Sequence, residues 1–366
     1  MDATSSESIA NTRPRAYKLL KMVGYAAFCQ GPKATMSHST QLLGISNAIV
    51  DILAHVDDRF IAEIGAERGA MNLIDENQAH EIYDKMGPAT EMSGGSVANT
   101  IAGFANLGGD AAYIGHVRDD QLGEIFNHDM RSLGIDIRLQ PATEGAPTAR
   151  SYILITPDAQ RTMNTYLGSC TELSLADVTP DSVASPRLIL LEGYVWDIAE
   201  GPELAREAMR IAAGNGTTVA LSLSDSFCVE RHRQAYEAAV REGVQIVIAD
   251  EDEINMLLQT TTFEATLEAL RDFDNLFVIT RSEKGSVIVQ GDTHIVQAAT
   301  PVEQVIDTTG AGDAYCAGFL YGWANDWPLD ECARLGTHCG TRVVQQVGAR
   351  IEPGLLDSYS PGSPLT

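Results

Sequence analysis

The chain has 366 residues, of which 44% are hydrophobic and 20% are charged, and its formal net charge is −25. These proportions suit a folded protein, whereas a nucleic-acid-binding protein needs clusters of Lys and Arg that this acidic sequence lacks. No run approaches the roughly 18 consecutive apolar residues of a membrane-spanning helix, so we expect neither nucleic acid nor a membrane as a partner.

The two ends of the chain differ in composition from the rest. Residues 1–36 are basic, although the whole chain is acidic, and they show no clear secretory cleavage pattern. We expect a disordered or non-native extension ahead of a start at Met36; the alternative is an organelle-targeting segment. Residues 357–366 are rich in Ser and Pro and are predicted to be a disordered tail, which leaves residues 37–356 as the folded domain.

Between these ends, short β-branched apolar runs alternate with helical patterns. Strands are predicted at residues 42–45, 112–117, 187–192, 218–222, 245–249, 276–280 and 286–289. Helices are predicted at residues 97–106, 121–133, 203–213, 233–241 and 263–271. This alternation predicts an α/β fold in three layers, with a largely parallel sheet between helices. Ligands of such sheets bind beyond the carboxyl ends of the strands.

Two segments do not fit the alternation. Residues 48–56 continue the first strand with alternating character, and residues 148–167 read as a hairpin that turns at Pro157-Asp158. A small accessory sheet that stands off the main sheet accounts for both segments. We expect about residues 48–75 and 136–170 to form it and to act as a β lid.

The strongest motif is DTTGAGDAYCAG at residues 307–318. Gly310, Ala311 and Gly312 are small enough for a ligand to approach the backbone amides closely. An apolar helix is predicted directly afterward, so these amides lie at a helix N-terminus, which is a site for anions. Asp313 in the same turn can face whatever the anion is attached to. The alternative is an N-cap Asp after a Gly-rich turn.

This motif resembles the second signature of PfkB-type, ribokinase-like carbohydrate and nucleoside kinases, D-[ST]-x-G-A-G-D followed by a small-residue helix. The resemblance implies an ATP-dependent phosphotransferase in which Asp313 accepts the proton of the hydroxyl group that is phosphorylated. It also implies a ribokinase-like sheet with a small β lid. A Walker loop is not the phosphate site, because no GK[ST] follows a Gly-rich run in the sequence.

The resemblance implies a Gly-Gly turn in the first third of the chain, and residues 93–99 read SGGSVAN. In the family this turn lets the backbone approach the acceptor sugar, and the Asn hydrogen-bonds its hydroxyl groups. Gly94, Gly95 and Asn99 take those positions. On its own the motif is also compatible with an ordinary turn between a strand and a helix.

The opening strand continues as SNAIVDI, with Asn47 and Asp51 four residues apart and therefore on one face of an extended segment. A carboxylate can accept hydrogen bonds from two vicinal hydroxyl groups, which predicts that Asp51 binds a ribose. The resemblance supports this role, since adenosine kinases use an Asp in a similar context. The alternative is an edge-strand Asp that prevents aggregation.

Further matches extend the resemblance over about residues 40–352. QRTMNTYLGS resembles the lid segment and implies that Arg161 reaches the transferring phosphate; the alternative is a solvated surface Arg. LEGYVW resembles the segment that stacks an aromatic ring on the acceptor base, which implies this role for Tyr194 rather than for a core aromatic. The residues implied to surround ATP are Ser224, Thr280, Gly285 and His338.

Two metal sites are implied by the resemblance. The N-x-x-E motif, which organises Mg²⁺ through water, appears as DEDE, with Glu253 in place and Asp250 where the family has Asn. This change removes an amide donor and adds negative charge near the phosphates; an acidic helix N-terminus is the alternative reading. Asp307 and Thr309, with residues 346–349, resemble a monovalent-cation site, which implies K⁺.

The overall pattern resembles bacterial adenosine kinases most, which implies transfer to the 5′-hydroxyl of adenosine to form AMP, as in purine salvage. The alternatives are a ribose or ketose kinase, an inosine or guanosine kinase, and a non-catalytic nucleotide-binding member of the fold. A dinucleotide-dependent oxidoreductase needs GxGxxG after the first strand, which Gly44 to Asn47 do not supply.

We expect a small molecule as the partner and a monomer or a homodimer as the assembly. The six cysteines are scattered without a CxxC pair, which predicts reduced thiols and a cytoplasmic location.

Overall fold

The computed structural model describes residues 40–158, 160–184 and 186–362. The expectation for residues 1–36 lies outside the described residues. Within the described part of the chain, no helix is long and apolar enough to span a bilayer.

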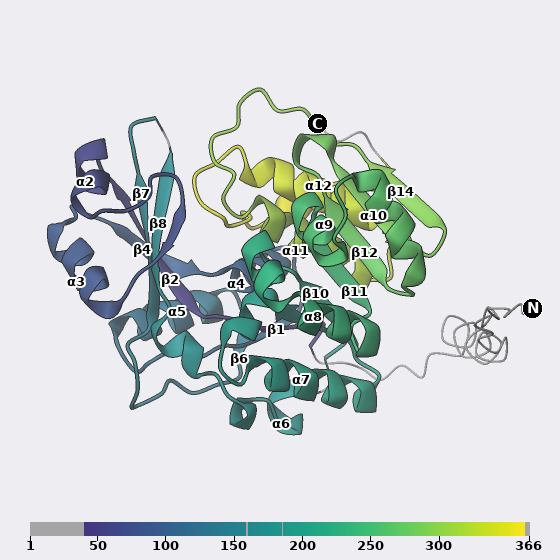
Figure 1. Ribbon diagram of the computed structural model, residues 1–366, viewed down its shortest axis with the longest axis horizontal. Helices are drawn as coiled ribbons and strands as arrows, with labels where there is room; N and C mark the ends of the chain where they lie inside the picture. Colours follow the sequence, from purple (N-terminus) through teal and green to yellow (C-terminus); the bar gives the residue numbers. More distant parts are fainter. Residues whose placement is uncertain (1–39, 159, 185, 363–366) are drawn as a thin grey trace, which may run out of the picture. The chain divides into compact units, whose positions relative to one another are not determined.

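A nine-stranded sheet is the centre of the described domain (Figure 1). Its strand order is β14-β13-β12-β11-β10-β9-β1-β5-β6. The strands are β1 Leu42–Ile45, β5 Ala111–Ile114, β6 Asp136–Ile137, β9 Leu188–Glu192, β10 Thr218–Ser222, β11 Ile246–Asp250, β12 Leu276–Thr280, β13 Ser286–Gln290 and β14 Thr293–Gln297. The strands from β6 to β12 pair in parallel, and β13 and β14 are antiparallel. The predicted parallel sheet is confirmed.

Helices cover both faces of this sheet because both faces of its strands are apolar. These helices are α4 Ser96–Asn106, α5 Gln121–Ser132, α6 Pro180–Val183, α7 Gly201–Asn215, α8 Ser226–Glu242, α9 Glu251–Leu258, α10 Phe263–Ala269, α11 Ala311–Ala324 and α12 Leu329–Val343. In β9, Ile189 and Leu191 belong to the core shared with α7 to α10, whereas Leu188 and Leu190 belong to the core shared with α4, α5, α11 and α12.

An accessory sheet of five strands, in the order β3-β8-β7-β2-β4, stands beside the main sheet (Figure 1). Its elements are β2 Ile49–His55, β3 Met71–Leu73, β4 Thr90–Gly94, β7 Ala149–Ile155 and β8 Arg161–Tyr166, with helices α2 Asp58–Glu63 and α3 Glu76–Lys85. The boundaries differ from the expected lid segments, because β4 and α3 belong to this part and β6 belongs to the main sheet. The TEMSG sequence of β4 has few β-branched residues and therefore gives little strand signal.

The C-terminal tail packs on the domain as far as the structure describes it, whereas disorder was predicted from residue 357. Tyr359 is buried, its ring stacks on Trp327 with centroids 6.0 Å apart, and its hydroxyl donates to Glu331 at 2.9 Å. The Ser and Pro content of the tail predicted disorder because composition does not report a single aromatic anchor of this kind.

The chain crosses between the two sheets at two places. It leaves β1 and enters β2 through residues 46–48, and it leaves β4 and enters α4 at Gly95. Both crossings lie at the carboxyl end of β1, which is the edge where ligands of parallel sheets bind.

Candidate active site

The Gly-rich turn begins helix α11 as predicted. Gly310 is the N-cap with a φ of +73°, and a Cβ at this position would lie 2.3 Å from the Cβ of Ala349. Both the conformation and the close approach require glycine. The amide of Ala311 donates to the carbonyl of Thr308 at 3.2 Å, whereas Gly312 is exposed and nothing lies within 4 Å of the place of a Cβ. Gly312 is therefore the better placed of the two amides to meet an anion.

Asp313 lies on the third residue of α11 and faces helix α4. Its carboxylate accepts hydrogen bonds from Ser96 Oγ at 2.7 Å and from Asn99 Nδ2 at 3.1 Å. Burial raises the pKa of Asp313 to about 6, while these two bonds and the charge of Arg350 oppose the rise. Gly310 caps the helix, so the N-cap interpretation of Asp313 is wrong. The carboxylate is ionised at neutral pH and lies one residue from the exposed amide of Gly312.

The two glycines of the 93–99 segment are needed for different reasons. A Cβ on Gly94 would lie 2.2 Å from Asp51 Oδ2, so this glycine makes room for that carboxylate. Gly95 has a φ of +96°, and a Cβ there would lie 2.8 Å from the carbonyl of Asn47. The Gly-Gly pair thus allows the Asp51 side chain and the Asn47 backbone to approach the same turn.

Asp51 and Asn47 both have polar atoms that suit a hydroxylated ligand. Burial raises the pKa of Asp51 to about 7, although Arg350 and Arg161 act in the opposite direction. Asn47 Oδ1 is buried without a hydrogen-bond partner among the described residues. An orphaned buried acceptor is costly, and a hydroxyl donor from a ligand would satisfy it.

Asp51 lines a cavity between the accessory sheet and the segments that carry Asn99, Thr309 and residues 348–350. It is lined by Asp51, Leu53, Met92, Ser93, Asn99, Ile153, Arg161, Thr309, Gly348, Ala349 and Arg350. Its volume is about 10 Å³, which is room for a single water, whereas small-molecule sites occupy roughly 300 Å³ or more. A substrate therefore does not fit this cavity in the conformation described.

Arg161 begins β8 and crosses from the accessory sheet to the Gly-rich turn. Its Nη2 lies 2.5 Å from Asp307 Oδ2, and the two side chains are 11% and 3% exposed. Arg161 Nη1 is buried and has no hydrogen-bond partner among the described residues. The interpretation of Arg161 as a solvated surface residue is therefore wrong. A guanidinium with an unsatisfied donor therefore lies beside the segment that leads into the Gly-rich turn at residues 310–312, which we call the anion turn.

The predicted potassium site meets the same ion pair. Asp307 accepts hydrogen bonds from the amides of Thr309 and Gly348 at 3.0 and 2.9 Å, in addition to the contact with Arg161. The guanidinium already supplies positive charge at this carboxylate. The residues therefore do not fit a K⁺ ion in this conformation, and potassium has no part in the mechanism proposed below.

Asp250 and Glu253 form the N-terminal cap of α9. Asp250 Oδ1 accepts from the amide of Glu253 at 2.7 Å, and Glu253 Oε2 accepts from the amide of Asp250 at 2.9 Å. Burial raises the pKa of Glu253 to about 8 and raises that of Asp250. Each carboxylate uses one oxygen in this box, and carboxylate oxygens suit magnesium or its bound waters. The donor set therefore fits Mg²⁺, whose binding stays a prediction.

Three of the residues implied to surround ATP lie at or after the carboxyl ends of β10 and β12, the two strands that flank β11. Ser224 comes after β10, Thr280 ends β12, and Gly285 follows with a φ of +88°. Ser282, which lies between Thr280 and Gly285, has a φ of +50°, a left-handed conformation that is strained for residues with a side chain. His338 lies in α12, where its ring is 5.6 Å from that of Tyr359. The ATP contacts of these residues stay predictions.

Tyr194 lies in the short 3-10 helix η3 Gly193–Asp197, after β9. Its hydroxyl donates to Asp225 Oδ2 at 2.5 Å, and its ring packs partly against the core. It is not among the residues that line the cavity at Asp51. Stacking of Tyr194 on an acceptor base stays a prediction.

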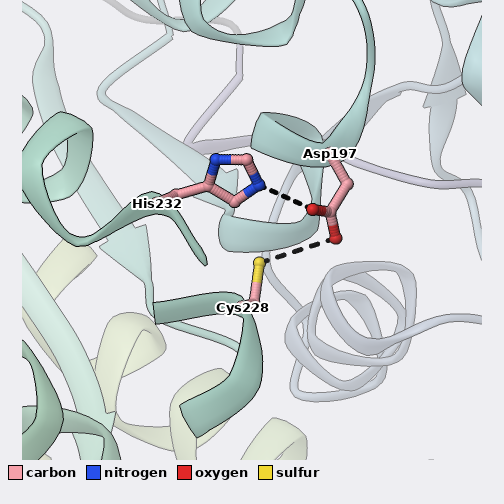
Figure 2. Close-up of side chains that lie close together, drawn as sticks. All are labelled: Asp197, Cys228 and His232. Atoms are coloured by element: carbon pink, nitrogen blue, oxygen red, sulfur yellow. Dashed lines mark hydrogen bonds and ion pairs between the residues drawn. The ribbon is translucent and has the colours of Figure 1, made fainter. Parts of the chain in front are cut away.

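Figure 2 shows Asp197, Cys228 and His232, a group with the residue types of a metal site beside η3. Arg231 already pairs with Asp197, with Nε 3.1 Å from Oδ1 and Nη2 2.6 Å from Oδ2, and burial raises the pKa of Cys228 to about 12. A neutral thiol and a carboxylate neutralised by Arg are poor metal ligands. The group instead fastens η3 to α8.

Sequence reasoning missed three residues that contact the site. Ser96 donates to Asp313, Glu192 binds two backbone amides of the acceptor region, and Arg350 binds two of its carbonyls. Glu192 could have been found, since a carboxylate that ends the apolar run LILLE is unusual for a buried strand. For Arg350 the sequence carries no signal, because its partners are more than 250 residues away along the chain.

A model of the pfkB family of carbohydrate kinases matches residues 70–354. A solved adenosine kinase from Sinorhizobium meliloti is 47% identical, with a TM-score of 0.81, and the match covers 87% of this chain and 98% of that one. A solved probable sugar kinase from Rhizobium etli CFN 42 is 42% identical, with a TM-score of 0.82 and coverage of 88% and 98%.

A curated relative, the 5-dehydro-2-deoxygluconokinase of Geobacillus kaustophilus, is 24% identical over 282 residues, which are 74% of this chain and 84% of the relative. The family model spans more than half of the chain, and the solved structures match its fold over nearly their whole length. This chain therefore belongs to the pfkB family of carbohydrate kinases, as a phosphotransferase with the ribokinase-like fold.

Proposed function

We propose that the protein transfers the terminal phosphate of ATP to the 5′-hydroxyl group of a nucleoside, adenosine in the first place, to form AMP. The observation that carries this proposal is the arrangement at α11: an ionised Asp313 follows the exposed residue Gly312 and contacts Asn99 of the acceptor segment, residues 93–99. A base, an anion site and a hydroxyl-binding side chain thus converge at one helix N-terminus.

The acceptor is held by the polar groups at the crossing between the sheets. Asp51 accepts from the two ribose hydroxyls, Asn47 Oδ1 takes up a hydroxyl donor that it lacks in the free protein, and Gly95 and Asn99 border the reacting group. Similarity to an adenosine kinase supports a nucleoside, and the carboxylate at Asp51 suits its vicinal diol.

The chemistry follows from alignment and charge. The amides of Ala311 and Gly312 bind the terminal phosphate at the start of α11, and Asp313 takes the proton as the acceptor oxygen attacks. Arg161 turns from Asp307 to the phosphate and neutralises the charge that develops there. Closure of the accessory sheet excludes water and so limits hydrolysis of ATP.

Magnesium fits the acidic start of α9, where Glu253 and Asp250 would hold it through water. Bound to the phosphates, it would neutralise negative charge that this acidic chain cannot offset with many cationic side chains.

A sugar kinase is the second candidate, since a probable sugar kinase and a 5-dehydro-2-deoxygluconokinase are among the similar proteins. Transfer of radiolabelled phosphate from ATP should be measured with adenosine, inosine, guanosine, ribose, fructose and 5-dehydro-2-deoxygluconate. We expect adenosine to give the highest kcat/KM. Phosphorylation of free sugars alone would eliminate the nucleoside assignment, and consumption of ATP that no acceptor stimulates would eliminate the kinase mechanism.

Activity should fall in acid because Asp313 works as an ionised base. Its pKa is raised to about 6, so the protonated, inactive form dominates below that pH and the ionised form above it. We expect kcat/KM for the acceptor at pH 5 to be about tenfold or more below its plateau near pH 8. The measurement is a pH profile at saturating ATP with Asp51→Asn as a comparison, since Asp51 also has a raised pKa. A profile that is flat from pH 5 to 8 contradicts the assignment.

A further inference from the structure

The buried side chain of Glu192 binds the backbone of the acceptor segment, residues 93–99. This residue ends β9 and is 1% exposed. Its Oε1 accepts from the amide of Val97 at 3.2 Å, and its Oε2 accepts from the amide of Asn47 at 2.9 Å. One carboxylate thus joins the two places at which the chain crosses between the sheets.

Arg350 binds other backbone groups of the same segment. Its Nη2 donates to the carbonyl of Ser93 at 2.5 Å and to Ser93 Oγ at 2.9 Å, and its Nη1 donates to the carbonyl of Ala98 at 3.0 Å. The planar guanidinium therefore bridges both ends of the segment, which a single ammonium group could not do with the same geometry.

The loop that carries Arg350 is also packed against the anion turn. The residue before it, Ala349, is the neighbour that excludes a Cβ from Gly310, and the amide of Gly348 donates to Asp307 at 2.9 Å. Residues 348–350 thus contact the phosphate side of the site and the acceptor side at once. Arg350 is the connection between the two.

Neither Arg350 nor Glu192 forms an ion pair within 4 Å with another described residue. Their role is therefore not to neutralise the charge of a partner. Burial lowers the pKa of Arg350, and the nearby carboxylates of Asp51, Asp129 and Asp313 oppose this. Burial raises the pKa of Glu192 to about 7. Buried ionisable groups are costly, and the hydrogen bonds that both side chains make here go to residues 93–98 and to the backbone of Asn47.

We propose that Arg350 and Glu192 are positioning residues that hold the acceptor segment in register with the anion turn. The proposal rests on the proposed function, because the position of the acceptor segment relative to the anion turn determines whether the acceptor oxygen is aligned with the terminal phosphate. Misplacement of reacting groups by about 1 Å costs on the order of 100-fold in rate. We name this pair the acceptor clamp.

The test compares Arg350→Met, Arg350→Lys and Glu192→Gln with Arg206→Met, which removes the same charge from an exposed position on α7. We expect Arg350→Met to lower kcat by about 100-fold and to raise KM for the acceptor, with KM for ATP within about twofold of the wild type. Arg350→Lys keeps the positive charge but loses the planar pair of N–H donors that reaches Ser93 and Ala98. It should therefore raise KM for the acceptor, while the acid limb of the pH profile of kcat/KM stays in place.

In Arg350→Met the acid limb of the pH profile should shift to higher pH by roughly half a unit or more, because the loss of a positive charge near Asp313 raises the pKa of that carboxylate. The groups facing Asp313 are Ser96, Asn99 and Thr100 of α4, Asp51 of β2, Glu192 of β9 and Arg350 itself. In Glu192→Gln the side-chain NH₂ group would face one of the two backbone N–H groups, and two donors cannot form a hydrogen bond. We therefore expect this variant to have a higher KM for the acceptor.

Hydrogen exchange of residues 93–99 in the free protein separates this proposal from the proposed function. Faster exchange in Arg350→Met than in Arg206→Met supports the clamp even if the wild type phosphorylates none of the acceptors tested. Wild-type exchange together with wild-type kcat and acceptor KM overturns it. If Arg350→Met does not fold, Arg350→Lys decides: an unchanged acceptor KM overturns the clamp, and a raised one supports it.

Discussion

We expect the replacement of Asp313 with Asn to lower turnover by on the order of 1000-fold and to leave the fold intact. The amide has the size of the carboxylate and can still accept a hydrogen bond from Asn99 Nδ2 while it donates to Ser96 Oγ, so both contacts of the side chain survive. It cannot take a proton from the acceptor hydroxyl. The measurement is kcat with saturating ATP and acceptor, together with thermal unfolding of the variant.

The control is Asp84→Asn, which makes the same change at an exposed position on α3. It should leave both turnover and stability near the wild-type values. Turnover close to normal in Asp313→Asn would exclude this residue as the base, since no rate-limiting proton transfer would then depend on its carboxylate.

We expect the replacement of Arg161 with Met to lower turnover by about 100-fold or more, because a positive charge that should meet the transferring phosphate is lost. It also leaves Asp307, which is 3% exposed, as a buried carboxylate without its cationic partner. Breaking such a pair costs about 3 kcal/mol of stability. Turnover must therefore be measured at a temperature at which chemical denaturation shows the variant to be folded.

Arg161→Lys separates the two effects. A lysine keeps a positive charge opposite Asp307 and should keep most of the stability, but it lacks the planar fork that matches phosphate oxygens. We expect its turnover to lie between those of the wild type and Arg161→Met. If folded Arg161→Met turns over at the wild-type rate, the ion pair supports the fold alone and Arg161 has no role in the chemistry.

The fold could be predicted from the sequence where its signal is local. The central parallel strands are short apolar runs such as the LILLE of β9, as burial on both faces favours, whereas the two-residue edge strand β6 carries no such signal. The anion turn is equally local, since Gly310 and Asp313 lie within four residues and the turn conformation itself demands the glycine. Both features are complete within one stretch of chain.

What could not be predicted depends on contacts between distant segments. Arg350 has its role because the loop at residues 348–350 closes against a turn more than 250 residues earlier, and nothing in the sequence QQVGAR indicates those partners. Packing of Tyr359 on Trp327 likewise orders a tail whose composition predicts disorder. The pairing of Arg161 with Asp307 joins a strand of the accessory sheet to the anion turn, and only the assembled domain brings them together.

The central claim is that the start of α11 binds the transferring phosphate while Asp313 faces the acceptor. A crystal structure with adenosine and a non-hydrolysable ATP analogue tests it most directly. We predict the terminal phosphate within about 3 Å of the amide of Gly312 and the 5′-oxygen within about 3 Å of an Asp313 oxygen. A phosphate bound elsewhere, or an acceptor hydroxyl that points away from Asp313 in the closed complex, would contradict the account.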